Sequence, residues 1–113
     1  MTDRPVPDPY NANCPSRYVI EVIASKWSLL LLPALMDGPK RNGQLMRQIQ
    51  GISQKMLTQT LKALEEYNLV QRYDYQEVPP KVEYTLTEQG RSLVGIIADL
   101  DQWVIDHFYE LKK

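Results

Sequence analysis

The sequence predicts a mainly helical domain with one small antiparallel β-hairpin. Apolar residues recur at spacings of three and four over most of the chain, which is typical of amphipathic helices. Residues 82–86 instead alternate apolar and polar side chains, as a half-buried strand does. The chain has 113 residues, of which 43% are hydrophobic and 24% charged, a length and composition suited to one globular domain.

The N-terminal residues 1–13 are predicted to form a flexible arm, because they hold three prolines and almost no large apolar side chain. The first helix should begin near Pro15, since proline suits a first helical turn. Its apolar stripe includes Tyr18 and Val22. Residues 14–113 are therefore expected to form the folded domain.

A second apolar segment runs from Trp27 to Met36 and ends at an Asp-Gly-Pro sequence, a strong terminator of helices. Pro33 lies inside this segment and cannot donate a helical hydrogen bond, so we expect a kink or a break there. A short third helix should follow, and it is separated from the next helix by a tight turn at residues 50–52.

The fourth helix is predicted from about Gln54 to Tyr67, with Ser53 as its N-cap. One of its faces is an apolar stripe directed at the core. The opposite face combines hydrogen-bonding and cationic side chains and contains no acid. Together with the N-cap, this polar set consists of Ser53, Gln54, Lys55, Thr58, Gln59 and Lys62.

Two strands and a long helix complete the chain. Residues 69–76 and 82–86 are predicted to pair in antiparallel fashion, and the two prolines between them should make a stiff, projecting tip. Thr87 should then cap a final helix from Glu88 to about Leu111. The tyrosines of this region are interpreted as strand and core aromatics: Tyr67, Tyr73, Tyr75 and Tyr84.

This order of elements is typical of a winged helix-turn-helix with an added long C-terminal helix. A short helix, a glycine-containing turn and a polar-faced second helix form the helix-turn-helix, and a hairpin directly after it forms the wing. A recognition helix of this kind fits the major groove of double-stranded DNA, where Gln, Lys and Thr side chains contact base edges. We therefore expect the polar set of the fourth helix to read bases.

The distribution of charge favours the same interpretation. Residues 40–81 hold seven basic and four acidic residues, a net charge of +3, whereas the rest of the chain carries −4. A basic centre with acidic flanks suits a protein that meets phosphate on one face. The residues expected to contact phosphate or form the wing are Lys40, Arg41, Arg47, Arg72, Pro79, Pro80 and Lys81.

The final helix predicts a homodimer. Its ~24 residues would span about 36 Å, longer than one small domain needs for its own core. An exposed apolar stripe of that length calls for a partner, and a two-fold dimer is the commonest solution. The predicted dimer interface, with the first helix as companion, consists of Tyr18, Val22, Leu93, Ile97, Leu100, Trp103, Val104 and Phe108.

Several segments resemble the HxlR-type winged helix-turn-helix regulators of bacteria and archaea, in order over roughly residues 14–105. The resemblance implies a homodimer that binds a two-fold operator and represses or activates nearby genes; we expect a repressor. The matching segments are Cys14-Pro15, Lys26-Trp27, Asp37-Gly38-Pro39, Gly51-Ile52-Ser53-Gln54-Lys55-Met56-Leu57, Leu64-Glu65-Glu66, Leu69-Val70, the stretch from Glu77 to Tyr84, and Thr87-Glu88-Gln89-Gly90.

Cys14 is the only cysteine, so no disulfide within one chain is possible and the reducing cytoplasm is the expected location. Two interpretations of this residue remain open. It is either a small buried hydrophobe or a redox-responsive thiol, because it precedes a helix N-terminus whose dipole favours the thiolate. Some members of the resembling family are regulated through a cysteine at this position, which implies a regulator that responds to oxidants or electrophiles.

The sequence predicts no enzyme, metal centre, cofactor or membrane anchor. It contains no recognisable nucleophile–base pair or phosphate loop, and the single histidine, His107, has no partner for a metal site. No apolar run approaches the ~20 residues that cross a bilayer. The sequence does not indicate a small-molecule effector. The alternative function is a winged-helix module for protein–protein contact, which salt-dependent DNA binding would distinguish from a regulator.

Overall fold

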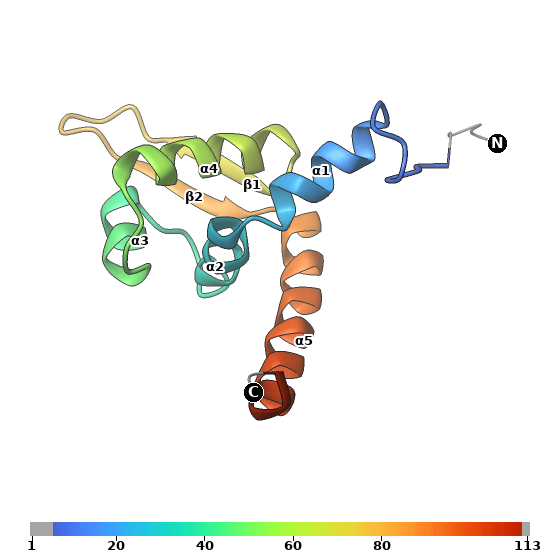
Figure 1. Ribbon diagram of the computed structural model, residues 1–113. Helices are drawn as coiled ribbons and strands as arrows, with labels where there is room; N and C mark the ends of the chain where they lie inside the picture. Colours follow the sequence, from blue (N-terminus) through green and yellow to red (C-terminus); the bar gives the residue numbers. More distant parts are fainter. Residues whose placement is uncertain (1–5, 112–113) are drawn as a thin grey trace.

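The computed structural model describes residues 6–111, which form five helices and a two-stranded antiparallel sheet (Figure 1). The predicted fold class is confirmed. Residues 1–5 of the predicted arm and residues 112 and 113 lie outside the described residues. The elements are α1 (Pro15–Ile23), α2 (Lys26–Ala34), α3 (Asn42–Gln48), α4 (Gln54–Glu66), β1 (Val70–Asp74), β2 (Val82–Leu86) and α5 (Glu88–Leu111).

The hydrophobic core lies where α2, α3 and α4 meet the base of the hairpin and the first half of α5. Helix α4 supplies Leu57, Leu61 and Leu64, whose spacings of four and three place them on one face. The central helix α2 supplies Leu31 and Leu32, both fully buried. Other core members are Leu35, Leu45, Ile49, Ile52, Leu69, Val70, Leu86, Val94 and Ile97.

Local capping interactions define where α4 and α5 begin, as predicted. The Ser53 hydroxyl accepts a hydrogen bond from the Met56 N–H at 3.0 Å. The Thr87 hydroxyl accepts from the Gly90 N–H at 3.0 Å and donates to the Asn68 carbonyl at 2.7 Å. Asn68 lies just after α4 and has a φ of 60°. The bond from Thr87 to its carbonyl therefore ties the end of α4 to the start of α5.

A kink or a break is expected at Pro33, and the break does not occur in α2. It continues through the proline and ends one residue later, at Ala34. The missing N–H of Pro33 removes a hydrogen bond only from the last turn, where the loss is small. The following amides of Leu35 and Met36 then bond to carbonyls three residues back, so the chain leaves the helix two residues before Met36.

The hairpin pairs Val70 with Leu86 at its base and Asp74 with Val82 at its outer end. One further bond, from the Tyr75 N–H to the Lys81 carbonyl, extends the ladder toward the tip. The tip projects as predicted, and the Val78 side chain is almost fully exposed. Strands β1 and β2 with the loop between them are called the wing below.

Two of the four tyrosines interpreted as strand and core aromatics are exposed instead. Tyr73 and Tyr75 lie on the solvent side of the wing and pack edge to face, with ring centroids 4.7 Å apart. Tyr73 is 61% exposed and Tyr75 is 39% exposed, so neither contributes to the core. Tyr67 and Tyr84, nearer the base of the hairpin, do pack against the core.

The elements separate into two ends (Figure 1). The wing tip, α3 and the first turn of α4 lie on one side of the molecule, whereas α1 lies on the other and α5 projects away from the body. Residues 8–13, part of the predicted flexible arm, form hydrogen-bonded turns that lead into Cys14 and α1. Over residues 6–111, no helix is both long and apolar enough to cross a membrane.

Candidate nucleic-acid interface

The polar face of α4 is formed by Gln54, Lys55, Thr58, Gln59 and Lys62, all of them exposed. Its side chains carry donors, acceptors and two positive charges, and the first acid on the helix is Glu65. One hydrogen bond within the face, from Gln54 Nε2 to Thr58 Oγ1 at 3.2 Å, orders the first turn. These are the group types that recognise base edges in a major groove.

Ser53, the remaining member of the predicted base-reading set, has a different place. Its hydroxyl oxygen accepts the hydrogen bond that caps α4. That bond occupies one of the two lone pairs of the hydroxyl oxygen and fixes the side chain against the first turn of the helix. The geometry therefore supports a role for Ser53 in positioning the recognition helix.

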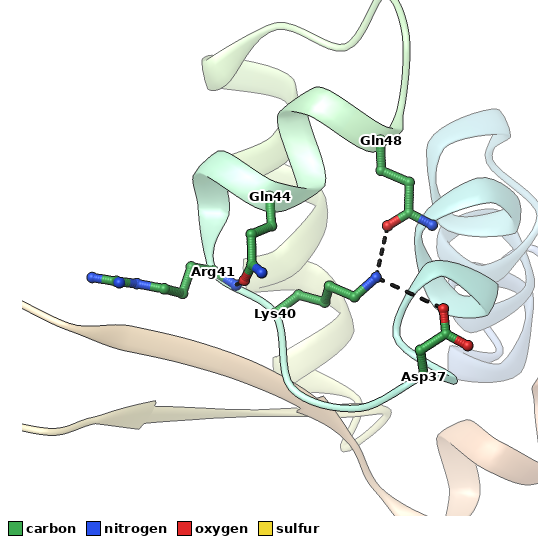
Figure 2. Close-up of polar contacts among 5 residues, drawn as sticks. All are labelled: Asp37, Lys40, Arg41, Gln44 and Gln48. Atoms are coloured by element: carbon green, nitrogen blue, oxygen red, sulfur yellow. Dashed lines mark hydrogen bonds and ion pairs between the residues drawn. The ribbon is translucent and has the colours of Figure 1, made fainter.

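Lys40 does not extend toward solvent as a phosphate-contacting lysine would. Its Nζ lies 2.8 Å from Gln48 Oε1 and 4.0 Å from Asp37 Oδ2, and its side chain is only 17% exposed (Figure 2). Its backbone forms a bridge with Tyr84 of β2 through bonds of 3.0 and 2.8 Å. We therefore expect Lys40 to fasten α3 and the preceding loop to the wing and not to bind phosphate.

Arg41 extends in the opposite direction from Lys40 (Figure 2). The guanidinium Nη2 donates to the Pro80 carbonyl at the wing tip, at 3.4 Å. The Arg41 backbone N–H donates to Gln44 Oε1 at 2.8 Å, which holds the residue at the start of α3. Arg72 of β1 borders the same hollow between α3 and the wing.

The other predicted phosphate-contacting residues are also at the surface. Arg47 is exposed on α3, and the two prolines form part of the exposed wing tip. The Lys81 ammonium lies over the Tyr75 ring, 4.3 Å from its centroid. The Tyr75 hydroxyl donates to a carboxylate oxygen of Glu83, and this hydrogen bond raises the pKa of Tyr75 above its usual value. These contacts hold the side chains of Lys81, Tyr75 and Glu83 together on the wing.

The second half of α5 carries exposed apolar side chains. Leu100, Trp103, Val104 and Phe108, four of the predicted interface residues, are 40–51% exposed. Sequence reasoning omitted Ile105 and Tyr109, which are also exposed, because neither falls on the stripe of three- and four-residue spacings that was used as the signal. The exposed surface therefore extends around more of the helix than predicted.

The predicted interface residues nearer the body differ from this group. Ile97 is only 2% exposed and lies in the core of its own chain, so its assignment to the interface is corrected. Leu93 and Val22 are partly buried against the same core. Tyr18 is half-exposed and packs beside Tyr67, with ring centroids 5.8 Å apart. Ile97 and Leu93 are covered by their own chain because the first half of α5 packs against α2.

Cys14 occupies the N-cap position of α1 and is partly exposed, so it is not a fully buried hydrophobe. Its Sγ lies 3.2 Å from Ser16 Oγ and accepts a hydrogen bond from the Asp8 N–H at 3.3 Å. These two hydrogen bonds, the Ser16 contact first, lower the pKa of the Cys14 thiol below its usual value. The site therefore favours the thiolate form of Cys14 more than a free cysteine does.

Other chemical groups offer little beyond packing. His107 stacks on Trp103, with centroids 4.6 Å apart, and its Nδ1 lies 2.9 Å from the Trp103 carbonyl oxygen. Within residues 6–111, no group of three or more His, Cys, Asp and Glu side chains is arranged to hold a metal ion.

The fold and the polar helix beside the wing define a winged helix-turn-helix protein, a DNA-binding transcriptional regulator. More particularly, the chain belongs to the family described as HxlR-like helix-turn-helix, whose pattern matches residues 22–112. The resemblance seen in the sequence is thereby confirmed. This family consists of transcriptional regulators.

Individual relatives agree with this membership. The chain is 52% identical over 91 residues to the HTH-type transcriptional regulator YkvN of Bacillus subtilis, covering 80% of this chain and 77% of YkvN. The structure of the transcriptional regulator ytfH from Salmonella typhimurium superposes with a TM-score of 0.86 at 38% identity, covering 94% and 95% of the two chains. The reduced form of the redox regulator HypR has a TM-score of 0.78 at 39% identity, covering 87% and 97%.

Proposed function

We propose that this regulator binds a two-fold operator as a homodimer, in a sequence-specific manner, and represses transcription. The observation that carries the proposal is the exposed, acid-free polar face of α4 beside the wing. In this arrangement α4 enters the major groove and reads bases. Arg41, Arg47, Arg72 and Lys81 contact the sugar–phosphate backbone on either side and supply affinity that falls with salt.

The dimer is supported by the apolar surface of α5. Four large side chains of its outer half are about half-exposed, and one small domain cannot cover them. A second copy of the chain is the proposed occupant, because a two-fold partner would present the same stripe and cover both surfaces at once. The exposed side of Tyr18 on α1 would extend this interface.

The operator is tested by selecting bound fragments from random DNA and footprinting the selected sites. We expect inverted repeats whose half-sites lie about 10 bp, or a multiple of that, from centre to centre. The binding constant should fall steeply between about 50 and 200 mM salt. Failure to enrich any sequence, or enrichment of a single half-site without symmetry, would contradict the proposal.

We also propose that Cys14 makes operator binding sensitive to oxidants or electrophiles. The support is its partial exposure, the lowered pKa of its thiol and the similarity of the chain to the redox regulator HypR. With diamide, two Cys14 thiols, one from each subunit, would give up two hydrogen atoms to the diazene and join in a disulfide. This bond would change the spacing of the two recognition helices.

Two measurements test the proposal for Cys14. Gel shifts with diamide, and again after dithiothreitol, should show reversible loss of operator binding by the wild type and constant binding by Cys14→Ser. The Ser16→Ala variant, which lacks the main hydrogen bond to the thiolate, should need a higher pH to reach half-maximal alkylation by iodoacetamide. Equal binding by both proteins with and without diamide would leave Cys14 without a sensing role.

A further inference from the structure

A hollow of about 300 Å³ lies between the start of α3 and the wing. Arg41 borders it from the helix side, and Arg72 borders it from β1. Pro80, Val82 and Tyr84 form its wing wall. Two residues that are far apart in the sequence therefore bring guanidinium groups to one small concave surface.

The backbone positions both arginines. The bridge between Lys40 and Tyr84 fixes the residue just before Arg41 on the edge of β2. Tyr84 is also the register partner of Arg72 on the neighbouring strand. Arg41 and Arg72 are thus held on either side of the same β2 residue, and the bond from Arg41 Nη2 to the Pro80 carbonyl directs the first guanidinium along the wing.

The charge of the hollow is positive and mostly uncompensated. None of its described lining residues is acidic. Asp74 approaches the Arg72 guanidinium only to 4.0 Å, and both side chains are more than 40% exposed, so water weakens this pair. Two cationic side chains that line one small hollow attract an anion into it. Phosphate suits them, because guanidinium groups donate paired hydrogen bonds to its oxygens.

We propose that Arg41 and Arg72 bind one and the same phosphate of the DNA backbone in this hollow. The inference rests on the proposed DNA-binding function and adds that the wing and the helix-turn-helix contact DNA as one unit. The walls of the hollow lie on the same side of the molecule as the first turn of α4 (Figure 1). A phosphate there would anchor the strand that borders the groove occupied by α4.

The salt dependence of operator binding can count the phosphates involved. Each neutralised phosphate contributes about 0.9 to the slope of log K against log salt concentration. Because the homodimer carries two such hollows, we expect the double variant Arg41→Gln/Arg72→Gln to lose about 1.8 of this slope, the contribution of one phosphate per subunit. The losses in affinity of the two single variants should not multiply to give that of the double variant. A loss of about 3.6, with losses that multiply, would mean two separate phosphates per subunit and would overturn the proposal.

A matched control comes from Lys62, on α4 and outside the hollow. In Arg41→Gln/Lys62→Gln the losses should multiply, because the two residues share no partner. All three side chains changed in these pairs are solvent-accessible, and thermal unfolding should show that each variant folds. If wild-type protein binds no DNA, the proposed function fails; if it binds and the Arg41/Arg72 losses multiply, only this inference fails.

The same phosphate chemistry could come from a free anion, and competition distinguishes the two sources. Inorganic phosphate is added at constant ionic strength while operator binding is measured. We expect less than a twofold change in the operator affinity of the wild type. A DNA phosphate is held in the hollow by the whole protein–DNA interface, whereas a free phosphate has only the hollow. A saturable tenfold loss that the double arginine variant does not show would assign the hollow to a free anion and overturn the proposal.

Discussion

Lys40 and Lys55 show how two residues of the same type, in the same basic region, have different roles. The Lys40 ammonium is held by Gln48 and Asp37 of its own chain, whereas Lys55 is exposed on the polar face of α4. An ammonium held by partners within the chain is less available to neutralise a DNA phosphate. The role of each lysine therefore follows from the direction of its side chain.

The Lys40→Met variant should be less stable by about 1 kcal/mol, because it loses the bond from Nζ to Gln48 while it keeps the aliphatic stem. Urea unfolding measures this difference. The slope of log K against log salt for operator binding should equal that of wild type. A reduction of the slope by about 1.8, one phosphate for each subunit of the dimer, would show that Lys40 does contact a phosphate.

Lys55 and Gln59 are expected to behave differently. Changing either to Ala should reduce discrimination between operator and random DNA by about 1–3 kcal/mol, the value of a good base contact. Fluorescence anisotropy with both DNAs at one salt concentration measures the ratio. The stability of the free protein should hardly change, since both side chains are exposed. Equal losses on both DNAs would indicate phosphate contacts instead of base reading.

Among the elements, α5 has two halves with different roles. Its first half packs against α2, and Gly90, Val94 and Ile97 are its buried residues. Its second half projects from the body (Figure 1). The two glycines of this helix allow a direct comparison, because Gly90 faces the core and Gly95 faces open space.

The Gly90→Ala variant should lose at least about 2 kcal/mol of unfolding free energy. A Cβ at this position would overlap the carbonyl oxygen of Leu69, and backbone there cannot move without disturbing the hairpin. Gly95→Ala is the control: a Cβ there meets nothing within 4 Å, so the variant should gain about 0.5–1 kcal/mol from higher helix propensity. Equal effects of the two changes on the urea midpoint would contradict this account of α5.

On the scale of the whole molecule, the terminal helix determines whether the protein works as one chain or two. Binding both half-sites needs two recognition helices about 34 Å apart, which one chain cannot supply. The apolar residues in the second half of α5 are the surface through which a second copy would provide the other helix.

The Phe108→Glu variant should therefore weaken the dimer and, with it, operator binding, because a charge in an apolar interface has no partner. Sedimentation at micromolar concentration should show a dimer for wild type and a shift toward monomer for the variant. Tyr109→Glu is the comparison: it makes a similar aromatic-to-acid change at a side chain that is 90% exposed and lies on the opposite side of the helix from Leu100. Because the Tyr109 ring packs edge to face on Phe108, with ring centroids 5.5 Å apart, this change should weaken the dimer less than Phe108→Glu but need not leave it unchanged. A monomeric wild type would refute the dimer.

The buried residues of α5 determine where this helix can be cut without unfolding the domain. Removing everything after Leu93 would delete Val94 and Ile97, which belong to the core of the chain itself, and would unfold the domain. A cut after Asp99 keeps both core residues and removes the exposed part of α5. The shorter variant should remain folded and monomeric and should bind operator weakly.

Much of this architecture is determined by the sequence alone, because the signals involved act within a few residues. Ser53 and Thr87 cap helices whose first turns they touch, and the polar face of α4 follows from its 3.6-residue period. The hairpin is likewise visible in the alternation of residues 82–86. These features identified the fold class and the recognition helix before any tertiary contact was known.

Tertiary structure alone decided which of the candidate residues are available for binding. Lys40 turns inward to Gln48, and Ile97 lies in the core of its own chain. Arg41 and Arg72 meet in one hollow only because the backbone before α3 pairs with the neighbouring β2 strand. Each of these outcomes depends on contacts between segments that are distant in sequence, and residue type and periodicity carry no information about such contacts.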